Sequence, residues 1–281
     1  MAADWRELLS VLELRDCTPV GVGAGSLSAP PGLTTCYQGA NLSLPYRRLF
    51  GGQLLAQFVA AAGLASPDKS IRSIHTNFPR EGLVDTDVRY DVDARHQGRS
   101  FDTLSLTAAQ GDRLIAVATV AMHVPDDGPD IQTIDPVPPL PGDDARKTIG
   151  LLPWEVRTVD DLDDPSAARP HHELWMRTPP VDDERLHPCV AAYATDLTLI
   201  GTALRPLEGF SQGGNGTAFH SAVTSHTIWF HRSFRTDEWL LIRQDSPILA
   251  GGRCYGRGDV ITQSGSLVAS FAQEAVVRMP S

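Results

Sequence analysis

Cysteine is scarce in this chain, and its copies lie far apart. Cys17, Cys36, Cys189 and Cys254 form no CxxC pair, so we expect reduced, structural cysteines in a cytoplasmic protein. The first residues, Met-Ala-Ala-Asp-Trp-Arg-Glu, include acids and lack the basic and then apolar order of a secretion signal.

The chain also lacks a net positive charge and long, uninterrupted apolar runs. The net charge of -10 argues against a general nucleic-acid surface, because such surfaces bind by neutralising phosphates. A small phosphorylated ligand held by a few arginines is still compatible with it. Residues 49–67 carry no charge, but Gln53, Gln57 and Ser66 interrupt them, which predicts a buried helix and no membrane span. With 42% apolar and 21% charged residues, the 281-residue chain suits a soluble protein of one large domain or two ordinary ones.

Three sequence anchors, the Arg of a Phe-x-Arg motif, the Arg of a Gly-Arg motif and a later Gly, occur twice in the same order. The first two are 19 residues apart in one copy and 21 in the other, and the second and third are 12 apart in both. Agreement across three anchors indicates an internal repeat. The anchors are Arg80, Arg99 and Gly111 in the first copy, and Arg232, Arg253 and Gly265 in the second.

Each copy places an alanine-rich apolar helix before segments of strand length. The helices are expected over residues 52–65 and 190–204. A helix followed by an antiparallel meander predicts an α+β unit in which a sheet wraps around the helix. We therefore predict an N-terminal repeat over residues 1–124, a Pro- and Asp-rich linker over 125–152, and a C-terminal repeat over 153–281 that carries the catalytic residues.

Asp196 is the one acidic residue in the second predicted helix, where it lies beside the core-facing stripe. A carboxylate there loses water, which raises its pKa unless other groups hydrogen-bond it. Two interpretations remain open: a functional carboxylate, or an Asp that caps or pairs at a helix end exposed by a local turn. The first predicted helix carries no acid, only Gln53 and Gln57.

Gln273 is the second polar exception. It is the lone polar side chain on an otherwise apolar face of the last predicted strand, and its counterpart in the first repeat is near Val120. A glutamine that satisfies a backbone group at the sheet edge would also explain it. Two such polar residues in one repeat and none in the other favour a site formed by Asp196 and Gln273.

Several motifs resemble those of the acyl-CoA thioesterase II family, over about residues 45–278. The resemblance implies a double hot-dog fold, that is, two repeats of an antiparallel sheet wrapped around a central helix. In that family an Asp, a Gln and a Thr or Ser hold the water that attacks the thioester, which implies these roles for Asp196 and Gln273. The motifs are Phe50-Gly-Gly-Gln53, Gly98-Arg-Ser-Phe101, Leu186-His-Pro with Ala192-Tyr-Ala-Thr-Asp196, Trp229-Phe-His-Arg232, Asp237-Glu-Trp-Leu-Leu241 and Leu267-Val-Ala-Ser with Gln273-Glu.

The third member of the family's set does not match. Counting back without gaps from Trp229 places the hydroxyl position at Val223. Thr224 should point to the opposite face, whereas Ser225 should share the face of Val223 and could supply the hydroxyl after a small shift. The predicted catalytic residues are therefore Asp196, Gln273 and Ser225. The alternative is an acyl-CoA binding protein with weak or lost turnover.

The predicted reaction is hydrolysis of acyl-CoA thioesters to free fatty acid and coenzyme A, without a cofactor or metal. An Asp with a raised pKa is a suitable base, and N–H groups at a helix N-terminus or a Gln amide would stabilise the oxyanion. A dehydratase or hydratase would instead need a His paired with an acid on the helix, and the second helix has no His in its body. Because hot-dog sheet edges usually pair, we expect a homodimer or homotetramer.

Three further patterns are weaker. Gly252 and Arg253 are candidate substrate-binding residues that could approach the phosphates of coenzyme A, although a bulged turn with surface arginines explains them equally well. Gly209-Phe-Ser211-Gln-Gly213 matches the serine-hydrolase pattern, but glycines follow it where that motif needs a helix. His220, His226 and His231 lack zinc-type spacing, so we expect packed or surface roles for them.

Overall fold

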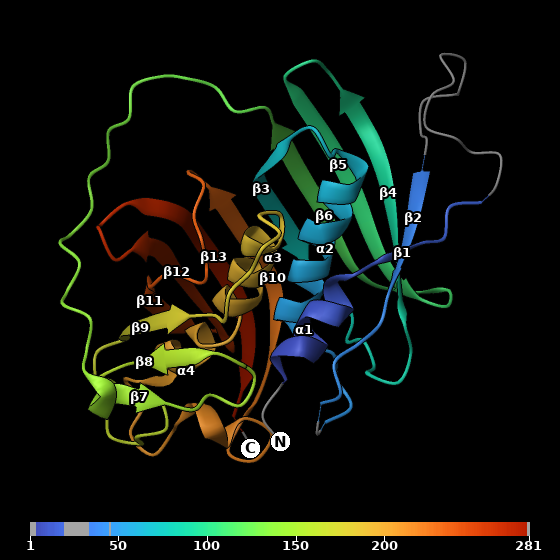
Figure 1. Cartoon of the computed structure of the whole chain (residues 1–281). Coiled ribbons are helices and arrows are strands. Elements are labelled where there is room, and N and C mark those ends of the chain that lie inside the picture. The colour runs from blue at the N-terminus through green and yellow to red at the C-terminus, as the bar shows by residue number, and fades with distance from the viewer. Residues whose placement is uncertain (1–3, 20–33, 45, 280–281) are drawn as a thin grey trace.

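One antiparallel sheet runs through the protein. The structure, a computed structural model, describes residues 4–19, 34–44 and 46–279, so the first three residues of the N-terminal segment considered above lie outside it. Within the described residues thirteen strands form the sheet, in the order β1-β2-β4-β5-β6-β3-β10-β13-β12-β11-β9-β8-β7. Figure 1 shows the two halves of this sheet, each curved around its own helix. The predicted architecture of two sheets, each wrapped around a helix, is confirmed.

The two repeats occupy the two halves of the sheet and meet where β3 pairs with β10. The first half comprises α1 (Trp5–Leu12), β1 (Arg15–Asp16), β2 (Thr34–Gly39), α2 (Gly51–Ala65), β3 (Ser70–Asn77), β4 (Val88–Gln97), β5 (Phe101–Gln110) and β6 (Arg113–His123). The second comprises η1 (Asp143–Ala145), β7 (Arg146–Lys147), β8 (Glu155–Arg157), β9 (His171–Arg177), α3 (Leu186–Thr195), α4 (Leu199–Leu204), η2 (Gln212–Gly214), β10 (His220–Phe230), β11 (Leu240–Ala250), β12 (Arg253–Thr262) and β13 (Leu267–Arg278). Residues 124–142 between the halves form no helix or strand.

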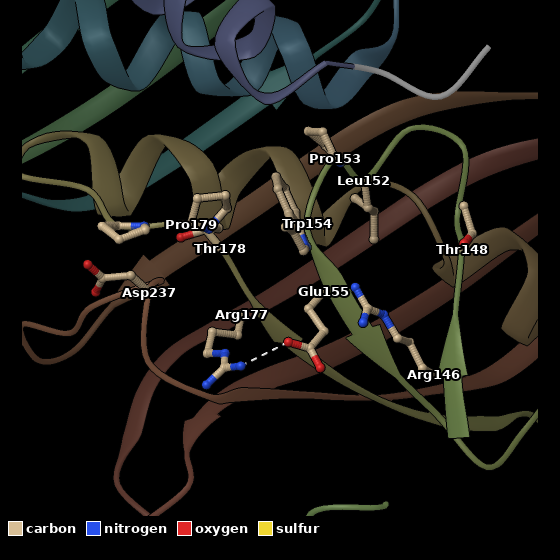
Figure 2. Close-up of a pocket in the computed structure, with 11 residues that line it drawn as sticks. Arg146, Thr148, Leu152, Pro153, Trp154, Glu155, Arg177, Thr178, Pro179 and Asp237 are labelled. Atoms are coloured by element: carbon tan, nitrogen blue, oxygen red, sulfur yellow. Dashed lines mark hydrogen bonds and ion pairs between the residues drawn. The ribbon is translucent and has the colours of Figure 1, made fainter. Parts of the chain in front are cut away.

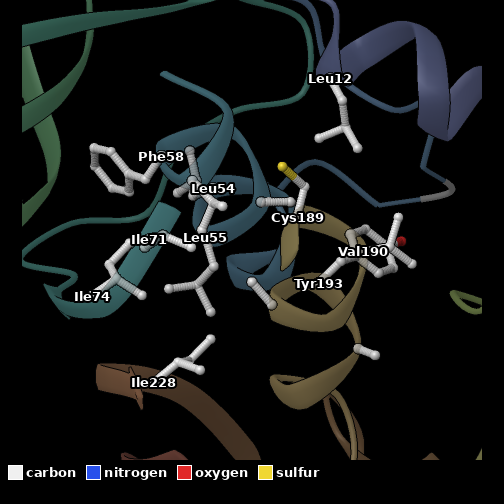
Figure 3. Packing of buried hydrophobic residues seen from close by; sticks show 14 of the residues in the cluster. Leu12, Leu54, Leu55, Phe58, Ile71, Ile74, Cys189, Val190, Tyr193 and Ile228 are labelled. Atoms are coloured by element: carbon white, nitrogen blue, oxygen red, sulfur yellow. The ribbon is translucent and has the colours of Figure 1, made fainter. Parts of the chain in front are cut away.

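The central helices α2 and α3 pack against each other across the boundary between the repeats. Figure 3 shows apolar side chains of both helices, such as Leu54 and Val190, within one continuous core. The approach is close because α2 begins with glycines: a Cβ on Gly52 would lie 2.4 Å from the carbonyl oxygen of Tyr193. The core therefore joins the two repeats into one unit.

The second central helix is interrupted, whereas the sequence predicted one helix over residues 190–204. The structure has α3 and α4, with a break over residues 196–198. Asp196 and Thr198 are poor helix formers, because their side chains compete for hydrogen bonds. The Thr198 hydroxyl accepts a hydrogen bond from Gln244 Nε2 (2.7 Å), and its carbonyl accepts one from the Thr202 hydroxyl (2.9 Å).

Strand β10 contains a β-bulge. Val223 lies opposite Ala275 of β13, but Ser225 lies opposite Glu274, so the register shifts by one residue between them. A bulge inserts one extra residue and changes which face the following side chains point to. This bulge decides which residues of β10 face α3.

The prediction of reduced cysteines is wrong for two of the four. Cys17 and Cys36 form a disulfide, with their Cα atoms 5.0 Å apart. The antiparallel pairing of β1 with β2 brings residue 17 opposite residue 36, where the Cys17 N–H donates to the Cys36 carbonyl. Their separation of 19 residues gave no indication of this pairing. Cys189 and Cys254 are free and buried.

Candidate active site

Asp196 is the C-cap residue of α3, and it is buried, with 4% of its surface exposed. The residue ends a helix, as one of the two open interpretations predicted, but no local turn exposes it; a functional role for the carboxylate stays a prediction. Burial raises the pKa of Asp196 to about 7, although a hydrogen bond from the Gly52 N–H acts in the opposite direction. The carboxyl therefore exchanges its proton near neutral pH, as a general base should.

The first turn of α2 lies directly against this carboxyl. A Cβ on Gly51 would lie 2.7 Å from Asp196 Oδ2, so only glycine leaves room for the carboxyl at this position. The N–H groups in the first turn of a helix have no intrahelical partner and carry the positive end of the helix dipole. The N-terminal repeat therefore contributes the start of α2 beside Asp196, which itself lies in the C-terminal repeat.

Gln273 faces the interior from β13, with 1% of its surface exposed. It lies opposite His226 of β10, and the His226 Nδ1 is 2.7 Å from the Gln273 Oε1. The same Nδ1 is 3.9 Å from Asp196 Oδ1. The structure therefore brings Asp196 and Gln273 near the same nitrogen of one imidazole ring, from a helix end and a strand that are far apart in the sequence.

Two atoms in this group have no hydrogen-bond partner among the described residues. They are Asp196 Oδ1, an acceptor when ionised, and Gln273 Nε2, a donor. Most buried polar atoms have a hydrogen-bond partner, and each exception needs an explanation. One acceptor and one donor together suit a molecule that can both donate and accept, and water is the smallest such molecule.

The prediction that Ser225 supplies a catalytic hydroxyl is wrong in this geometry. Ser225 directly precedes His226, which points inward, and successive side chains on a strand point to opposite faces. Ser225 therefore points away from Gln273. The bulge after Val223 reverses the parity on which the prediction depended. Val223, opposite the buried Ala275, does face the interior, so the inner position holds a methyl-bearing side chain without a hydroxyl.

His226 is the main residue that the sequence analysis missed, because we assigned it a packed or surface role. It is packed, with no exposed surface and its ring stacked on Phe271 at a centroid distance of 5.9 Å. Its Nε2 also lies 3.1 Å from the Thr195 hydroxyl. Burial lowers the pKa of His226 to about 4, so the ring is neutral at physiological pH. The period-two pattern of His226, Ile228 and Phe230 could have indicated an inward position.

Gly252 and Arg253 are not brought together with Asp196. Gly252 lies in the turn between β11 and β12, with a φ of 72° that favours glycine, and Arg253 is the first residue of β12. Arg253 is 61% exposed, and its Nε is 3.8 Å from Glu274 Oε1 on the outer side of the sheet. A role for the two residues in binding coenzyme A stays a prediction.

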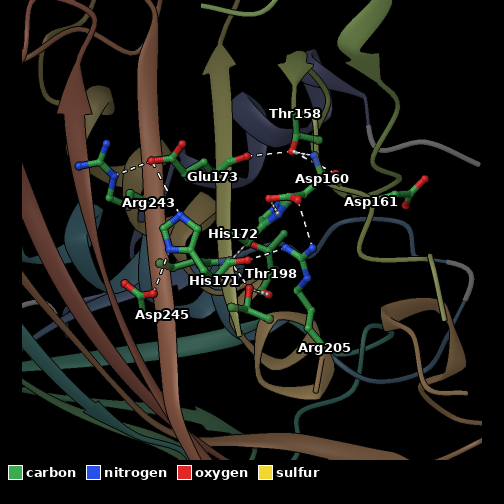
Figure 4. Close-up of polar contacts among 12 residues, drawn as sticks. Thr158, Asp160, Asp161, His171, His172, Glu173, Thr198, Arg205, Arg243 and Asp245 are labelled. Carbon is green, nitrogen blue, oxygen red and sulfur yellow. Dashed lines mark hydrogen bonds and ion pairs between the residues drawn. The ribbon is translucent and has the colours of Figure 1, made fainter. Parts of the chain in front are cut away.

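Another buried histidine belongs to a separate polar cluster (Figure 4). Burial lowers the pKa of His172 to about 4, and the nearby Asp160 carboxylate only partly opposes this. Arg205 bonds both Asp160 (3.1 Å) and the carbonyl of His171. These bonds connect the end of α4 to β9, and the cluster includes none of Asp196, His226 and Gln273.

The pocket in Figure 2 and the serine-hydrolase pattern also lie apart from the catalytic candidates. The pocket is lined by Glu155 of β8, Arg177 of β9 and the neighbouring Trp154, and by neither Asp196 nor Gln273. Ser211 lies between α4 and the short η2, so no strand precedes it as the serine-hydrolase motif requires. Across the described residues, no group of three or more His, Cys, Asp or Glu side chains could hold a metal ion.

The comparisons with known proteins agree on one family. The acyl-CoA thioesterase N-terminal domain family matches residues 43–123, and the acyl-CoA thioesterase C-terminal domain family matches residues 125–277. Acyl-CoA thioesterase 2 of Haemophilus influenzae is 31% identical over 267 residues, which cover 86% of this chain and 92% of that protein.

Solved structures support the same assignment. The acyl-CoA thioesterase II TesB2 of Mycobacterium marinum is 29% identical, with a TM-score of 0.73 and 98% of each chain covered. A protein of Alicyclobacillus acidocaldarius described as having a hot dog fold is 16% identical, with a TM-score of 0.72 and 98% of each chain covered, and it bears on the fold alone. The chain has a double hot-dog fold and belongs to the acyl-CoA thioesterase II family.

Proposed function

We propose that this protein hydrolyses acyl-CoA thioesters with a water molecule activated by Asp196 and Gln273. The observation that carries the proposal is the pair of buried atoms without partners, Asp196 Oδ1 and Gln273 Nε2. A water between them would donate one proton to the carboxylate and accept a hydrogen bond from the amide. Its remaining lone pair is then available to attack a carbonyl carbon.

The chemistry follows from these positions. The water oxygen forms a bond to the thioester carbonyl carbon while its proton passes to the Asp196 carboxylate, whose raised pKa makes it a suitable acceptor. The negative charge that develops on the carbonyl oxygen is stabilised by the positive end of the α2 helix dipole. When the intermediate collapses, the carbon–sulfur bond breaks and coenzyme A leaves as a thiolate. The thiolate takes up the proton from Asp196, which restores the carboxylate.

Val223 sets the expected rate. Family members hold the water with a third group, a hydroxyl, and this chain has a valine at that inner position. By analogy with the loss of one oxyanion donor, we expect a rate about 10- to 1000-fold below that of a chain with the hydroxyl. Asp196 and Gln273 are unaffected by this substitution, so turnover should persist.

The test is release of free coenzyme A thiol from acyl-CoAs of increasing chain length. The wild type should release thiol, and Asp196→Asn should lower kcat by about 100- to 10,000-fold, the usual contribution of a general base. Ser211→Ala serves as the control and should retain full activity. If the wild type releases no more thiol than Asp196→Asn but still binds acyl-CoA, the protein is an acyl-CoA binding protein and the proposal fails.

Assembly and location stay predictions. The homodimer or homotetramer expected from sheet pairing can be checked by sedimentation at micromolar concentration, where a stable monomer would contradict it. None of the described helices is long and apolar enough to cross a membrane. The disulfide between Cys17 and Cys36 argues against the predicted cytoplasmic location, since disulfides are rare in reducing compartments. Counting free thiols in protein alkylated at the moment of cell lysis would decide between the two.

A further inference from the structure

His226 lies inside the proposed active site, but the mechanism above assigns it no step. It has no exposed surface, and both ring nitrogens contact polar groups of the site. Nδ1 is 2.7 Å from the Gln273 Oε1, and Nε2 is 3.1 Å from the Thr195 hydroxyl. Since Thr195 directly precedes Asp196, a chain of hydrogen bonds runs from the end of α3 through His226 to Gln273.

The orientation of the Gln273 amide, with its oxygen toward the ring, implies which nitrogen of His226 carries the proton. An amide oxygen only accepts hydrogen bonds, so a contact of 2.7 Å with Gln273 Oε1 requires a proton on Nδ1. The opposite tautomer would place the Nδ1 lone pair against that oxygen. With the proton on Nδ1, the Nε2 lone pair can accept from the Thr195 hydroxyl 3.1 Å away, for which the Ala192 carbonyl oxygen at 3.0 Å is a second acceptor.

The same contact couples the orientation of the Gln273 amide to this tautomer of His226. If the amide rotated by half a turn, its NH₂ group would meet the Nδ1 proton and its oxygen would turn toward the carboxylate side of the site. With the oxygen bonded to His226, the NH₂ group is the end that remains without a partner. This is the end that the proposed mechanism uses to hold water opposite Asp196 Oδ1.

His226 is poorly placed to act as the base itself. Both of its nitrogens are already engaged, and Nδ1 is 3.9 Å from Asp196 Oδ1, beyond hydrogen-bonding distance. A neutral ring with an Nδ1–H that donates to an amide oxygen has no free lone pair directed at a substrate. Its effect on the reaction must therefore pass through Gln273.

We infer that His226 is a positioning residue that, held by Thr195, orients the Gln273 amide so that its NH₂ group faces Asp196. This inference rests on the proposed function, in which Gln273 holds the attacking water. It assigns Thr195 and His226 to the site, and it explains why a fully buried histidine keeps two polar partners in an otherwise apolar core.

The kinetic test is a double-mutant cycle with Gln273. His226→Leu should lower kcat about 10- to 100-fold and leave KM within about threefold, because the loss concerns an oriented donor and not substrate binding. In a Gln273→Ala background the same change should lower kcat by less than about threefold, since no amide remains to orient. His226→Asn, whose side-chain NH₂ can reach the position of Nδ1–H, should restore most of the activity. Thermal unfolding of each variant identifies any that fail to fold.

Equal losses from His226→Leu in both backgrounds would overturn the inference, and so would a His226→Asn variant no better than His226→Leu. A second measurement does not depend on activity. The ¹⁵N chemical shifts of the His226 ring should show a neutral ring with its proton on Nδ1, and Thr195→Val should weaken this preference. A proton on Nε2 in the wild type would refute the inference. A wild type that releases no thiol would instead refute the proposed function.

Discussion

Replacing Asp196 with Asn should stabilise the fold at neutral and alkaline pH while it removes hydrolysis. Burial raises the pKa of Asp196 from its ordinary value of 3.8 to about 7, so the folded state disfavours the ionised carboxylate. Each pH unit between the two pKa values corresponds to about 1.4 kcal/mol. Above pH 7 the wild type therefore carries a penalty of about 4 kcal/mol that the neutral Asn avoids.

The pH dependence has a defined direction. Below about pH 4 Asp196 is protonated in both the folded and the unfolded state, and the penalty is absent. Between about pH 4 and pH 7 only the unfolded state releases the proton, so the free energy of unfolding falls as the pH rises. Above pH 7 both states are ionised and the difference is constant. The stability advantage of Asp196→Asn should therefore grow by about 3 kcal/mol between pH 5 and pH 8.

Chemical denaturation of both proteins at pH 5, 6, 7 and 8 measures this difference. Asp102→Asn is the matched control, because Asp102 is equally buried but is paired with Lys69 (3.0 Å) and the Ser66 hydroxyl (2.8 Å). Removing a paired buried charge should destabilise the protein by about 3 kcal/mol or more, which is the opposite sign. An Asp196→Asn variant that is less stable than the wild type at pH 8, or whose advantage does not change with pH, would refute the reasoning.

The remaining predictions concern the rate of thiol release. Below pH 7, kcat/KM should fall about tenfold per pH unit as Asp196 becomes protonated, and a flat pH–rate profile from pH 5 to 8 would contradict its role as base. Gly51→Ala should lower kcat about 100-fold, because the added Cβ would lie 2.7 Å from an Asp196 oxygen. Gly63→Ala in the same helix meets no atom within 4 Å, so it should keep full activity and add about 0.5–1 kcal/mol of stability; equal activity of the two variants would exclude the steric argument. Val223→Thr should raise kcat about tenfold or more by restoring an inward hydroxyl, whereas Ser225→Ala should leave kcat unchanged; the reverse order would mean that Ser225 faces the site.

The repeat made much of the fold predictable from the sequence. Helical spacing and period-two alternation gave one helix and a meander per copy, and the difference between copies singled out Asp196 and Gln273. Helical spacing and period-two alternation can be read from one segment at a time, because each shows which face of a single helix or strand is apolar. The break after α3 was not predictable in this way, since it depends on a bond between Thr198 and Gln244, which belongs to another element.

The unpredicted parts of the site depend on contacts between elements. The bulge in β10 changes the inward residue from Ser225 to His226, and the spacing of the motifs does not reveal it. Gly51 appeared in a matching motif, but its contact with Asp196 arises only when α2 packs against the end of α3. The pairing of Cys17 with Cys36 likewise follows from the register of two strands.

The contact between α2 and α3 has a consequence for how the two halves of the chain depend on each other. The Asp196 carboxylate belongs to one half and the Gly52 N–H that bonds it belongs to the other, so neither half contains the whole of the proposed site. A protein cut within residues 124–142 would hydrolyse thioesters only while its two fragments stay associated. The rate of thiol release would then report the affinity of one repeat for the other. Replacing an apolar residue between α2 and α3 would lower the measured activity by weakening this association.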